Sequence, residues 1–341
     1  MTSTQHWFPR SILFSIWNVF TSNIPGLFLW PLRRLFITFS STAPNGEYRE
    51  PDDEERLQSA DIQSSENTLP TFTIRPPPTV TIRPASERRD NHKLLTIGIF
   101  AEVYLLDDHI IRKIPRSQSE EDLQPILREA LIYNILGAHP RIAEWLSRGI
   151  SDYIEITYYS HGDLVEYLDR NPITPELRSK WYQQILEAIV FIHSRGVIHS
   201  DLALRQFFID ENFDLRLGDF NSSQCPGHAA LGYEKASHCL PRNYELPNTE
   251  ASDIFALGST LYELVTGKAP YSELYGPKTD DPDIIKARLR RQDVIDYDIE
   301  SRYKNGIFPD VSDVFGGKII LGCWRGEIST AQGALDLYLH G

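Results

Sequence analysis

The chain has 341 residues, 41% of them hydrophobic, which is enough for a domain of about 250 residues with a sizeable core and for further segments. Its net charge of −13 excludes a general nucleic-acid-binding protein, because such a protein needs a basic surface to replace the counterions of the phosphates. The three cysteines are few and odd in number, which indicates a reducing compartment and not a disulfide framework.

Residues 1–40 are apolar and aromatic and contain no acidic residue. Within them, residues 11–32 carry no charge over a length that can span a bilayer, although serine and asparagine recur there at helical spacing. Two alternatives stay open: membrane contact through residues 7–39, or a leader that packs against nothing. We expect a cytoplasmic protein in either case. If the segment spans a membrane, Arg33 and Arg34 outweigh Arg10 and should keep the following domain on the cytoplasmic side.

Residues 41–92 are polar and proline-rich and include the acidic cluster GEYREPDDEER. Such a composition cannot bury enough apolar surface to offset the entropy of ordering, so it predicts a disordered linker. From residue 93 to residue 341, strand-like and helix-like patterns alternate without a break. This pattern predicts one compact domain of the α+β class.

The first part of this domain, residues 93–115, holds three β-rich runs that are separated by a glycine and by an aspartate pair. A helix is predicted from the N-cap Ser119 to Gly137. We expect Pro125 to split this helix into a short first turn and a main helix, because proline lacks the N–H that the helix ladder needs.

The second part of the domain is helix-rich. A strong helix start lies at Thr174, an N-cap residue, followed by Pro175 at the first helical position. The apolar residues that follow share one helical face and predict its buried side: Leu177, Trp181, Ile185, Ala188, Ile189 and Ile192. Another apolar helix is predicted to end near Gly267.

The stretch at residues 197–223, VIHSDLALRQFFIDENFDLRLGDFNSS, carries the strongest chemical signal. Asp201 stands in a short loop, two short strand patterns then predict a hairpin, and Asp219 follows 18 residues after Asp201. One such carboxylate can accept the proton of an acceptor hydroxyl, and the other can hold a divalent cation against nucleotide phosphates. The spacing therefore indicates phosphoryl transfer.

The same stretch resembles the catalytic loop and the metal loop of protein kinases, which normally read HRDLxxxxN and DFG. Here they read HSDLALRQ at residues 199–206 and DFN at residues 219–221. On these motifs the chain is identified as a divergent, fungal-type member of the eukaryotic protein-kinase-like family. The resemblance implies a bilobal fold, with a small β-rich N-lobe (residues 93–157) that carries one main helix and a larger α-helical C-lobe (residues 158–341).

The resemblance also assigns the catalytic residues. Asp201 would act on the acceptor hydroxyl, and Lys113 would contact the ATP phosphates while Glu129 on the helix holds it. Arg112 is an alternative to Lys113, but the alternation of side chains along a strand favours the lysine. Asp253 would brace the backbone of the catalytic loop.

Two side chains are implied to hold the metal ion, which would be Mg²⁺ or Mn²⁺. Asp219 is the stronger candidate, since Gln206 replaces the usual asparagine with a side chain that is one methylene longer. The nucleotide loop is the weakest match, because only Gly98 remains of three expected glycines. Residues implied to bind ATP are Gly98, Val103, Lys113, Thr157, Tyr159, Asp163 and Phe208.

Among these, residues 157–159 would offer backbone hydrogen bonds to adenine, and Asp163 would reach the ribose. A buried strand followed by an N-capped helix would explain the same residues without a ligand. Ile111 and Phe208 would flank the adenine, where smaller groups are usual, so the pocket is expected to be tight.

Several positions depart from the family pattern. Ser200 replaces the arginine that usually gathers a phosphorylated activation segment, so we expect activity that does not depend on that phosphorylation. Asn221 replaces a glycine, which reduces backbone freedom. Arg242 stands where a buried glutamate is expected, and Glu327 is a candidate for its reversed ion-pair partner.

These departures leave two interpretations open. An active kinase would transfer phosphate from ATP to an unknown protein substrate, whereas a pseudokinase would act as a scaffold or allosteric partner. The retention of all four charged groups favours the first. The acceptor stays undecided, because Ala203 with Arg205 resembles a tyrosine-kinase loop. A zinc site is a third alternative, built from Cys225, His228, His238 and Cys239.

Overall fold

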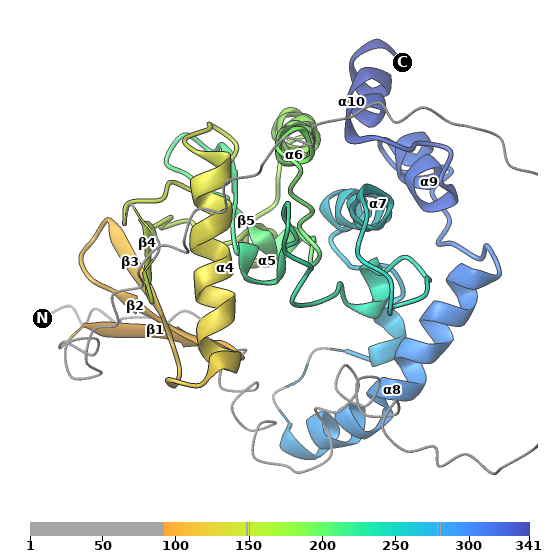
Figure 1. The fold of residues 1–341 in the computed structure, drawn as a ribbon. Helices are drawn as coiled ribbons and strands as arrows, with labels where there is room; N and C mark the ends of the chain where they lie inside the picture. Colours follow the sequence, from red (N-terminus) through yellow and green to blue (C-terminus); the bar gives the residue numbers. More distant parts are fainter. Residues whose placement is uncertain (1–91, 148, 150, 278, 280) are drawn as a thin grey trace, which may run out of the picture. The chain divides into compact units, whose positions relative to one another are not determined.

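The computed structural model describes residues 92–147, 149, 151–277, 279 and 281–341 (Figure 1). Its first part is a four-stranded antiparallel sheet in the order β1-β2-β3-β4. The strands are β1 (Lys93–Ile97), β2 (Ala101–Leu105), β3 (Ile110–Pro115) and β4 (Ile154–Thr157). The three predicted β-rich runs are thus confirmed, and the fourth strand returns after the helix to pair with β3.

Helix α4 (Glu120–Leu136) lies across this sheet (Figure 1). As predicted, Ser119 caps it by accepting a hydrogen bond from the N–H of Asp122, and the helix ends at Gly137, whose φ is 64°. The prediction that Pro125 splits the helix is wrong, because the helix continues through it. Pro125 is buried close to the N-terminus, where packing against the domain outweighs the loss of one backbone hydrogen bond.

The second part is mainly helical, as predicted. Its helices are α5 (Leu164–Arg170), α6 (Pro175–Ser194), α7 (Glu250–Thr266), α8 (Pro282–Lys304), α9 (Gly317–Arg325) and α10 (Ala331–His340). A small hairpin of β5 (Phe207–Ile209) and β6 (Leu215–Leu217) lies between α6 and α7 in the chain. Short 3₁₀ turns are η2 (Leu204–Gln206), η3 (Phe220–Ser222), η4 (Ala236–His238) and η5 (Ser272–Tyr275).

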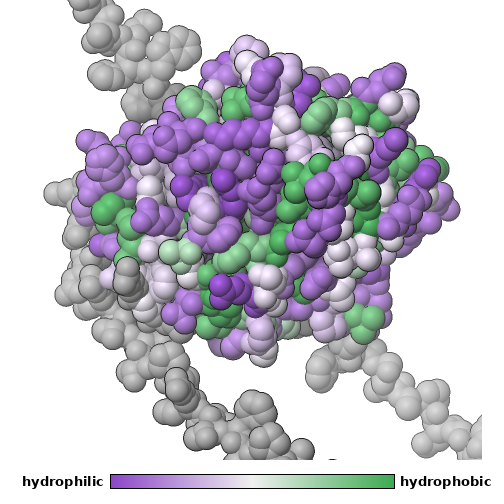
Figure 2. Space-filling view, turned by 90° about the horizontal axis from the view of Figure 1, so that it is seen from above, coloured by the Kyte–Doolittle hydropathy of each residue, from purple (hydrophilic) through white to green (hydrophobic). Residues whose placement is uncertain are grey.

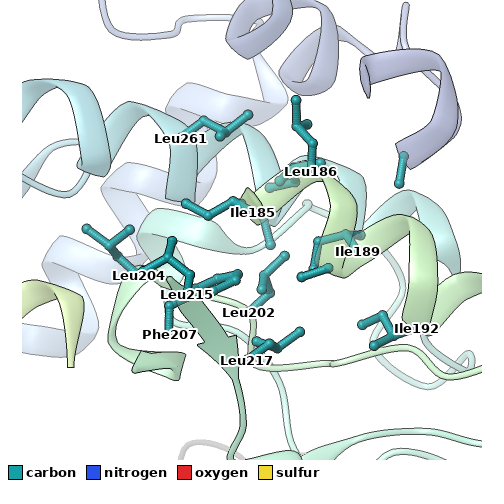
Figure 3. Close-up of a cluster of buried hydrophobic side chains, with 14 of the residues drawn as sticks. Ile185, Leu186, Ile189, Ile192, Leu202, Leu204, Phe207, Leu215, Leu217 and Leu261 are labelled. Atoms are coloured by element: carbon teal, nitrogen blue, oxygen red, sulfur yellow. The ribbon is translucent and has the colours of Figure 1, made fainter. Parts of the chain in front are cut away.

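Helix α6 is the centre of the core. Thr174 caps it and Pro175 begins it, and its predicted inner face is buried except for the half-buried Leu177. Figure 3 shows this face pointing toward the catalytic loop, the β5–β6 hairpin and α7. The labelled partners are Leu202, Leu204, Phe207, Leu215, Leu217 and Leu261, all at most 1% exposed. The loops that carry Asp201 and Asp219 are therefore anchored on α6.

The surface of the domain is mixed in character. Figure 2 shows one face on which hydrophilic residues predominate and hydrophobic residues are scattered between them. Such scattering is ordinary for a folded domain.

Within the described residues, no helix combines the length and apolar character needed to cross a membrane. The predictions for residues 1–40 and for the linker up to residue 91 concern parts of the chain outside the described residues.

Helices α7 and α9 approach each other closely at Gly258. A Cβ atom placed there would lie 2.9 Å from Cβ of Cys323 and 3.0 Å from the carbonyl oxygen of Ile320. Across the same contact, the indole N–H of Trp324 donates to Oγ of Ser259 at 2.9 Å. The absence of a side chain at Gly258 is thus what lets α9 close the core over α7.

We predict that Gly258→Ala lowers the free energy of unfolding by about 1–3 kcal/mol, because the added methyl group overpacks this contact. Denaturant unfolding of the full chain measures the change. Gly333→Ala in α10 is the control, since its Cβ would meet only the Thr330 hydroxyl, at 3.2 Å. Equal stability of Gly258→Ala and the parent would contradict the close packing.

Candidate active site

Lys113 on β3 joins two carboxylates that come from distant parts of the chain. Its Nζ atom lies 2.7 Å from Oε2 of Glu129 on α4 and 2.5 Å from Oδ1 of Asp219, which follows β6. Arg112 points to the other face of the sheet and pairs with Glu155 at 2.5 Å. The strand alternation that favoured Lys113 over Arg112 therefore identified the correct residue.

Burial and charge act against each other in this cluster. Burial opposes the charge on Lys113, but the carboxylates of Asp219 and Glu129 raise the pKa of the ammonium above its usual value. Burial also opposes the charge on Asp219, yet the pKa of Asp219 is lowered because Lys113 lies beside it. The ammonium group and the Asp219 carboxylate thus stay charged at neutral pH.

The metal loop is held by an aromatic contact. Phe220 is fully buried, with its ring centroid 5.4 Å from that of Tyr133 on α4 and 5.3 Å from that of His199 in the catalytic loop. Tyr133 stacks in turn on Trp145, at 6.1 Å. Sequence reasoning missed Tyr133 and Trp145, although Tyr133 stands four residues after Glu129 and so shares its helical face.

Asp253 of α7 braces the catalytic loop as the resemblance implied. Its two carboxylate oxygens accept hydrogen bonds from the backbone N–H groups of His199, at 2.7 Å, and Ser200, at 3.0 Å. Asp253 is fully buried, and His193 lies 3.0 Å from it. Because a buried carboxylate needs such partners, Asp253 fixes the loop immediately before Asp201.

Asp201 is flanked by two side chains of its own loop. Arg205 donates to its Oδ1 at 2.5 Å, and the amide nitrogen of Gln206 donates to its Oδ2 at 2.9 Å. Both partners orient the carboxylate of Asp201. Arg205 was noticed in the sequence only as part of the loop resemblance, and its contact with Asp201 was not predicted.

The two candidate metal ligands, Asp219 and Gln206, differ in which of their oxygen atoms are free to bind a cation. Oδ1 of Asp219 accepts from Lys113 and, at 2.9 Å, from the amide nitrogen of Asn221, whereas Oδ2 accepts no hydrogen bond from the described residues. The nitrogen of Gln206 is used by Asp201, which leaves its oxygen for a metal. The described residues contain no cluster of three or more His, Cys, Asp or Glu side chains that could hold a metal. A metal at Asp219 would therefore take further ligands from water or from phosphate oxygens.

The expected nucleotide loop is closed by its own hydrogen bond. The N–H of Gly98 donates to the carbonyl oxygen of Ala101 at 2.7 Å, so this amide is not available to a phosphate as expected. A tight turn between β1 and β2 satisfies the amide locally. Val103 is placed as expected, since it pairs with Lys113 in the β2–β3 register.

The hinge residues are only partly available. The N–H of Thr157 donates to the carbonyl oxygen of Glu144 at 3.0 Å, so a backbone contact of Thr157 with adenine, which stays a prediction, would have to use its carbonyl oxygen. The N–H of Tyr159 forms no hydrogen bond to the described residues, and its hydroxyl accepts from the N–H of Glu144 at 2.9 Å. Phe208 stacks on Tyr159 at 5.9 Å, and a Cβ on Gly218 would lie 2.9 Å from the Phe208 ring. The stacked rings of Tyr159 and Phe208 therefore occupy space beside Gly218, in line with the expectation of a tight adenine pocket.

Asp163 serves first as a helix cap. Its Oδ1 atom accepts from the N–H groups of Val165 at 2.9 Å and Glu166 at 3.0 Å, which satisfies the start of α5. Burial raises the pKa of Asp163 to about 6. The interpretation without a ligand thus explains Asp163, and only its second oxygen is left for a ribose.

Two predictions for the activation segment, which lies between Asp219 and Arg242, are corrected. Arg242 pairs with the buried Glu234 at 3.2 Å, whereas the expected partner Glu327 lies near Arg325 at 3.8 Å. The zinc alternative is not supported by the described residues, because they contain no metal cluster. The side chain of His238 is engaged by Ser237, and that of Cys239 by Arg242, while Cys225 and His228 pair through their backbones.

Arg128, next to Glu129 on α4, ties the helix to the activation segment. Its Nη1 atom donates to the carbonyl oxygens of Ser223, at 2.6 Å, and Ala229, at 2.5 Å. Ser200, at the position of the usual arginine, is buried and donates to the carbonyl oxygen of Ile198. A cation thus holds backbone carbonyls here, and sequence reasoning missed it because the acceptors are not side chains.

Comparison with known proteins agrees with this geometry. Residues 92–307 match the protein kinase domain family. The chain is 32% identical over 170 residues to the cell cycle serine/threonine-protein kinase CDC5/MSD2 of Saccharomyces cerevisiae, covering 45% of this chain and 23% of that protein. It is 30% identical over 214 residues to CBL-interacting protein kinase 10 of Oryza sativa subsp. japonica, covering 55% and 46%.

A further relative is CBL-interacting serine/threonine-protein kinase 16 of Arabidopsis thaliana, with 28% identity over 207 residues, 52% of this chain and 44% of that protein. The matched part thus spans between about a quarter and a half of the length of these relatives. The family match, in contrast, covers more than half of this chain and includes Lys113, Glu129, Asp201 and Asp219. The chain therefore belongs to the protein kinase domain family.

Proposed function

We propose that this chain is an ATP-dependent protein kinase that transfers the γ-phosphate of ATP to a hydroxyl group of a protein substrate. The observation that carries the proposal is the contact of Lys113 with both Glu129 and Asp219. It brings the phosphate-binding cation and the metal-binding carboxylate together beside the catalytic loop. All four charged groups of the family pattern are present, which favours an active kinase over the pseudokinase alternative.

The residues divide the chemistry as follows. Asp201 orients the acceptor hydroxyl and takes its proton while the new P–O bond forms and the bond to the departing ADP breaks. Lys113 binds phosphate oxygens, and Arg205, which lies 2.5 Å from Asp201, orients the Asp201 carboxylate. Mg²⁺ or Mn²⁺ held by Asp219, with the oxygen of Gln206, would neutralise the phosphates.

We propose serine or threonine as the acceptor. The support is that two of the relatives described above are named serine/threonine kinases. Against it stands the loop DLALR, in which Arg205 and not a lysine contacts Asp201. The labelled amino acid in the transfer assay decides the point: phosphoserine or phosphothreonine is expected, and phosphotyrosine alone would contradict the assignment.

We predict that Asp201→Asn in the full chain abolishes transfer of labelled phosphate to a generic protein but leaves ATP binding intact. Lys113→Met should weaken ATP binding, because it removes the cation that binds the phosphates. Thermal stabilisation by ATP with Mg²⁺ or Mn²⁺ measures binding. Unchanged transfer in Asp201→Asn would refute its role, and absence of ATP binding in the parent would favour the pseudokinase.

We also predict activity that is independent of activation-segment phosphorylation. Ser223 and Ser237 are buried, and Ser200 provides no cation for a phosphate. Phosphatase treatment should change the rate little, whereas Arg128→Ala should lower it roughly tenfold or more, since about 1.5–3 kcal/mol of charged hydrogen bonding is lost. Arg170→Ala is the control, since it removes an exposed arginine that lies 3.6 Å from the partly buried Glu166. A large loss of activity after dephosphorylation would show that another cation gathers a phosphate.

A further inference from the structure

The N-terminal half of α8 differs in charge from the rest of the domain. Residues 1–91 hold 9 of the 34 basic and 10 of the 47 acidic residues, which leaves residues 92–341 with a net charge of −12. Between residues 284 and 292, in contrast, α8 has no acidic residue and four basic ones: Lys286, Arg288, Arg290 and Arg291. An acidic domain thus carries one concentrated basic segment on this helix.

Part of this segment faces solvent together with two apolar side chains. Lys286, Arg290, Val294 and Tyr297 follow one another at spacings of four, four and three residues and so share one helical face. We call this face, together with the exposed Arg291 beside it, the α8 stripe. Val294 is 67% exposed and Tyr297 is 69% exposed. Arg290 and its neighbour Arg291 form no ion pair and no hydrogen bond with the described residues, and Lys286 lies 4.0 Å from one exposed carboxylate. Within the described residues, the cations of the stripe thus have one long ion pair between them, and its apolar side chains face solvent.

The opposite face of α8 packs against η4 of the activation segment. Ile295, Ile299 and Tyr303 are buried there, and the hydroxyl of Tyr303 donates to the carbonyl oxygen of Ser237 in η4 at 2.8 Å. Thirteen residues separate Arg290 from Tyr303, a distance of about 20 Å along the helix axis. In Figure 1, α8 lies at the side of the domain away from the sheet.

We propose that the α8 stripe docks an acidic segment of the protein substrate that also carries apolar side chains. The inference deepens the proposed function and rests on it, since a docked partner becomes a substrate only if the site transfers phosphate. Charge complementarity selects the partner: a domain of net charge −12 repels an acidic chain over most of its surface and attracts it at Arg290 and Arg291. Val294 and Tyr297 supply the apolar contact that ion pairs alone would lack.

The geometry also restricts where the acceptor stands. About 20 Å of helix separates Arg290 from the contact with η4, and about six residues of extended chain span this distance. The acidic docking residues should thus lie about six or more residues from the phosphorylated hydroxyl. A shorter spacing would not let one substrate chain reach both places.

The test compares an acidic with a basic acceptor protein on the full chain. Dephosphorylated casein is the acidic probe and histone is the basic one. In the variant Arg290→Glu with Arg291→Glu, the KM for casein should rise roughly three- to tenfold at low salt with kcat unchanged, while transfer to histone is not weakened. Lys93→Glu with Lys318→Glu, which changes the net charge equally at exposed positions on β1 and α9, should leave the KM for casein unchanged.

Binding of labelled casein without nucleotide, followed by fluorescence anisotropy, separates the two proposals. If neither protein is phosphorylated, the proposed function fails, and the binding experiment alone decides on the stripe. Weaker casein binding in Arg290→Glu with Arg291→Glu and in Tyr297→Ala supports the docking surface. Equal casein binding by parent and variants overturns it. It is also overturned if the substitutions change only the self-association of the chain, which sedimentation of parent and variant measures.

Discussion

One ammonium group between two carboxylates connects the three parts of the candidate site. Lys113 belongs to the sheet, Glu129 to α4 and Asp219 to the loop after β6, and both contacts are 2.7 Å or shorter. Glu129 is 1% exposed, so its charge is tolerable only beside the lysine. Removing one partner of a buried pair costs about 3–5 kcal/mol, so this contact adds substantially to the packing that holds α4 in place.

A chain of buried contacts links α4 to the catalytic loop. Tyr133 on α4 contacts Phe220, which contacts His199, and His199 is held by Asp253 through its backbone N–H. Each link is either a buried ring contact or a hydrogen bond to a buried carboxylate. Asp201 is therefore placed by the same core that forms around α6, and the chemistry of the site depends on the integrity of that core.

The sequence was sufficient for the parts of the site that depend on local pattern and on order along the chain. Strand alternation distinguished Lys113 from Arg112, and helix caps marked the ends of α4 and the start of α6. The family resemblance supplied the two-part fold and the pair Asp201 and Asp219. Strand alternation, helix caps and motif spacing depend on residue types at fixed separations along the chain, so they can be read from a single sequence.

Features that depend on contacts between irregular segments were not predictable in this way. The partner of Arg242 is Glu234, eight residues away in the same segment, and no periodicity points to it. Arg128 donates its hydrogen bonds to backbone carbonyl oxygens, and because every residue has such a group, the residue types do not identify the acceptors. Thr157 and Gly98 have their N–H groups satisfied by neighbouring backbone, which depends on the loop conformation and not on residue type.

The most direct test of the central contact is the ATP affinity of Glu129→Gln in the full chain, measured by calorimetry with Mg²⁺. Glutamine keeps the shape and a hydrogen bond but removes the charge that holds Lys113. The account predicts affinity that is weaker by roughly tenfold, or about 1.4 kcal/mol, while Glu155→Gln beside Arg112 leaves it unchanged. Equal affinity of Glu129→Gln and the parent would contradict the account.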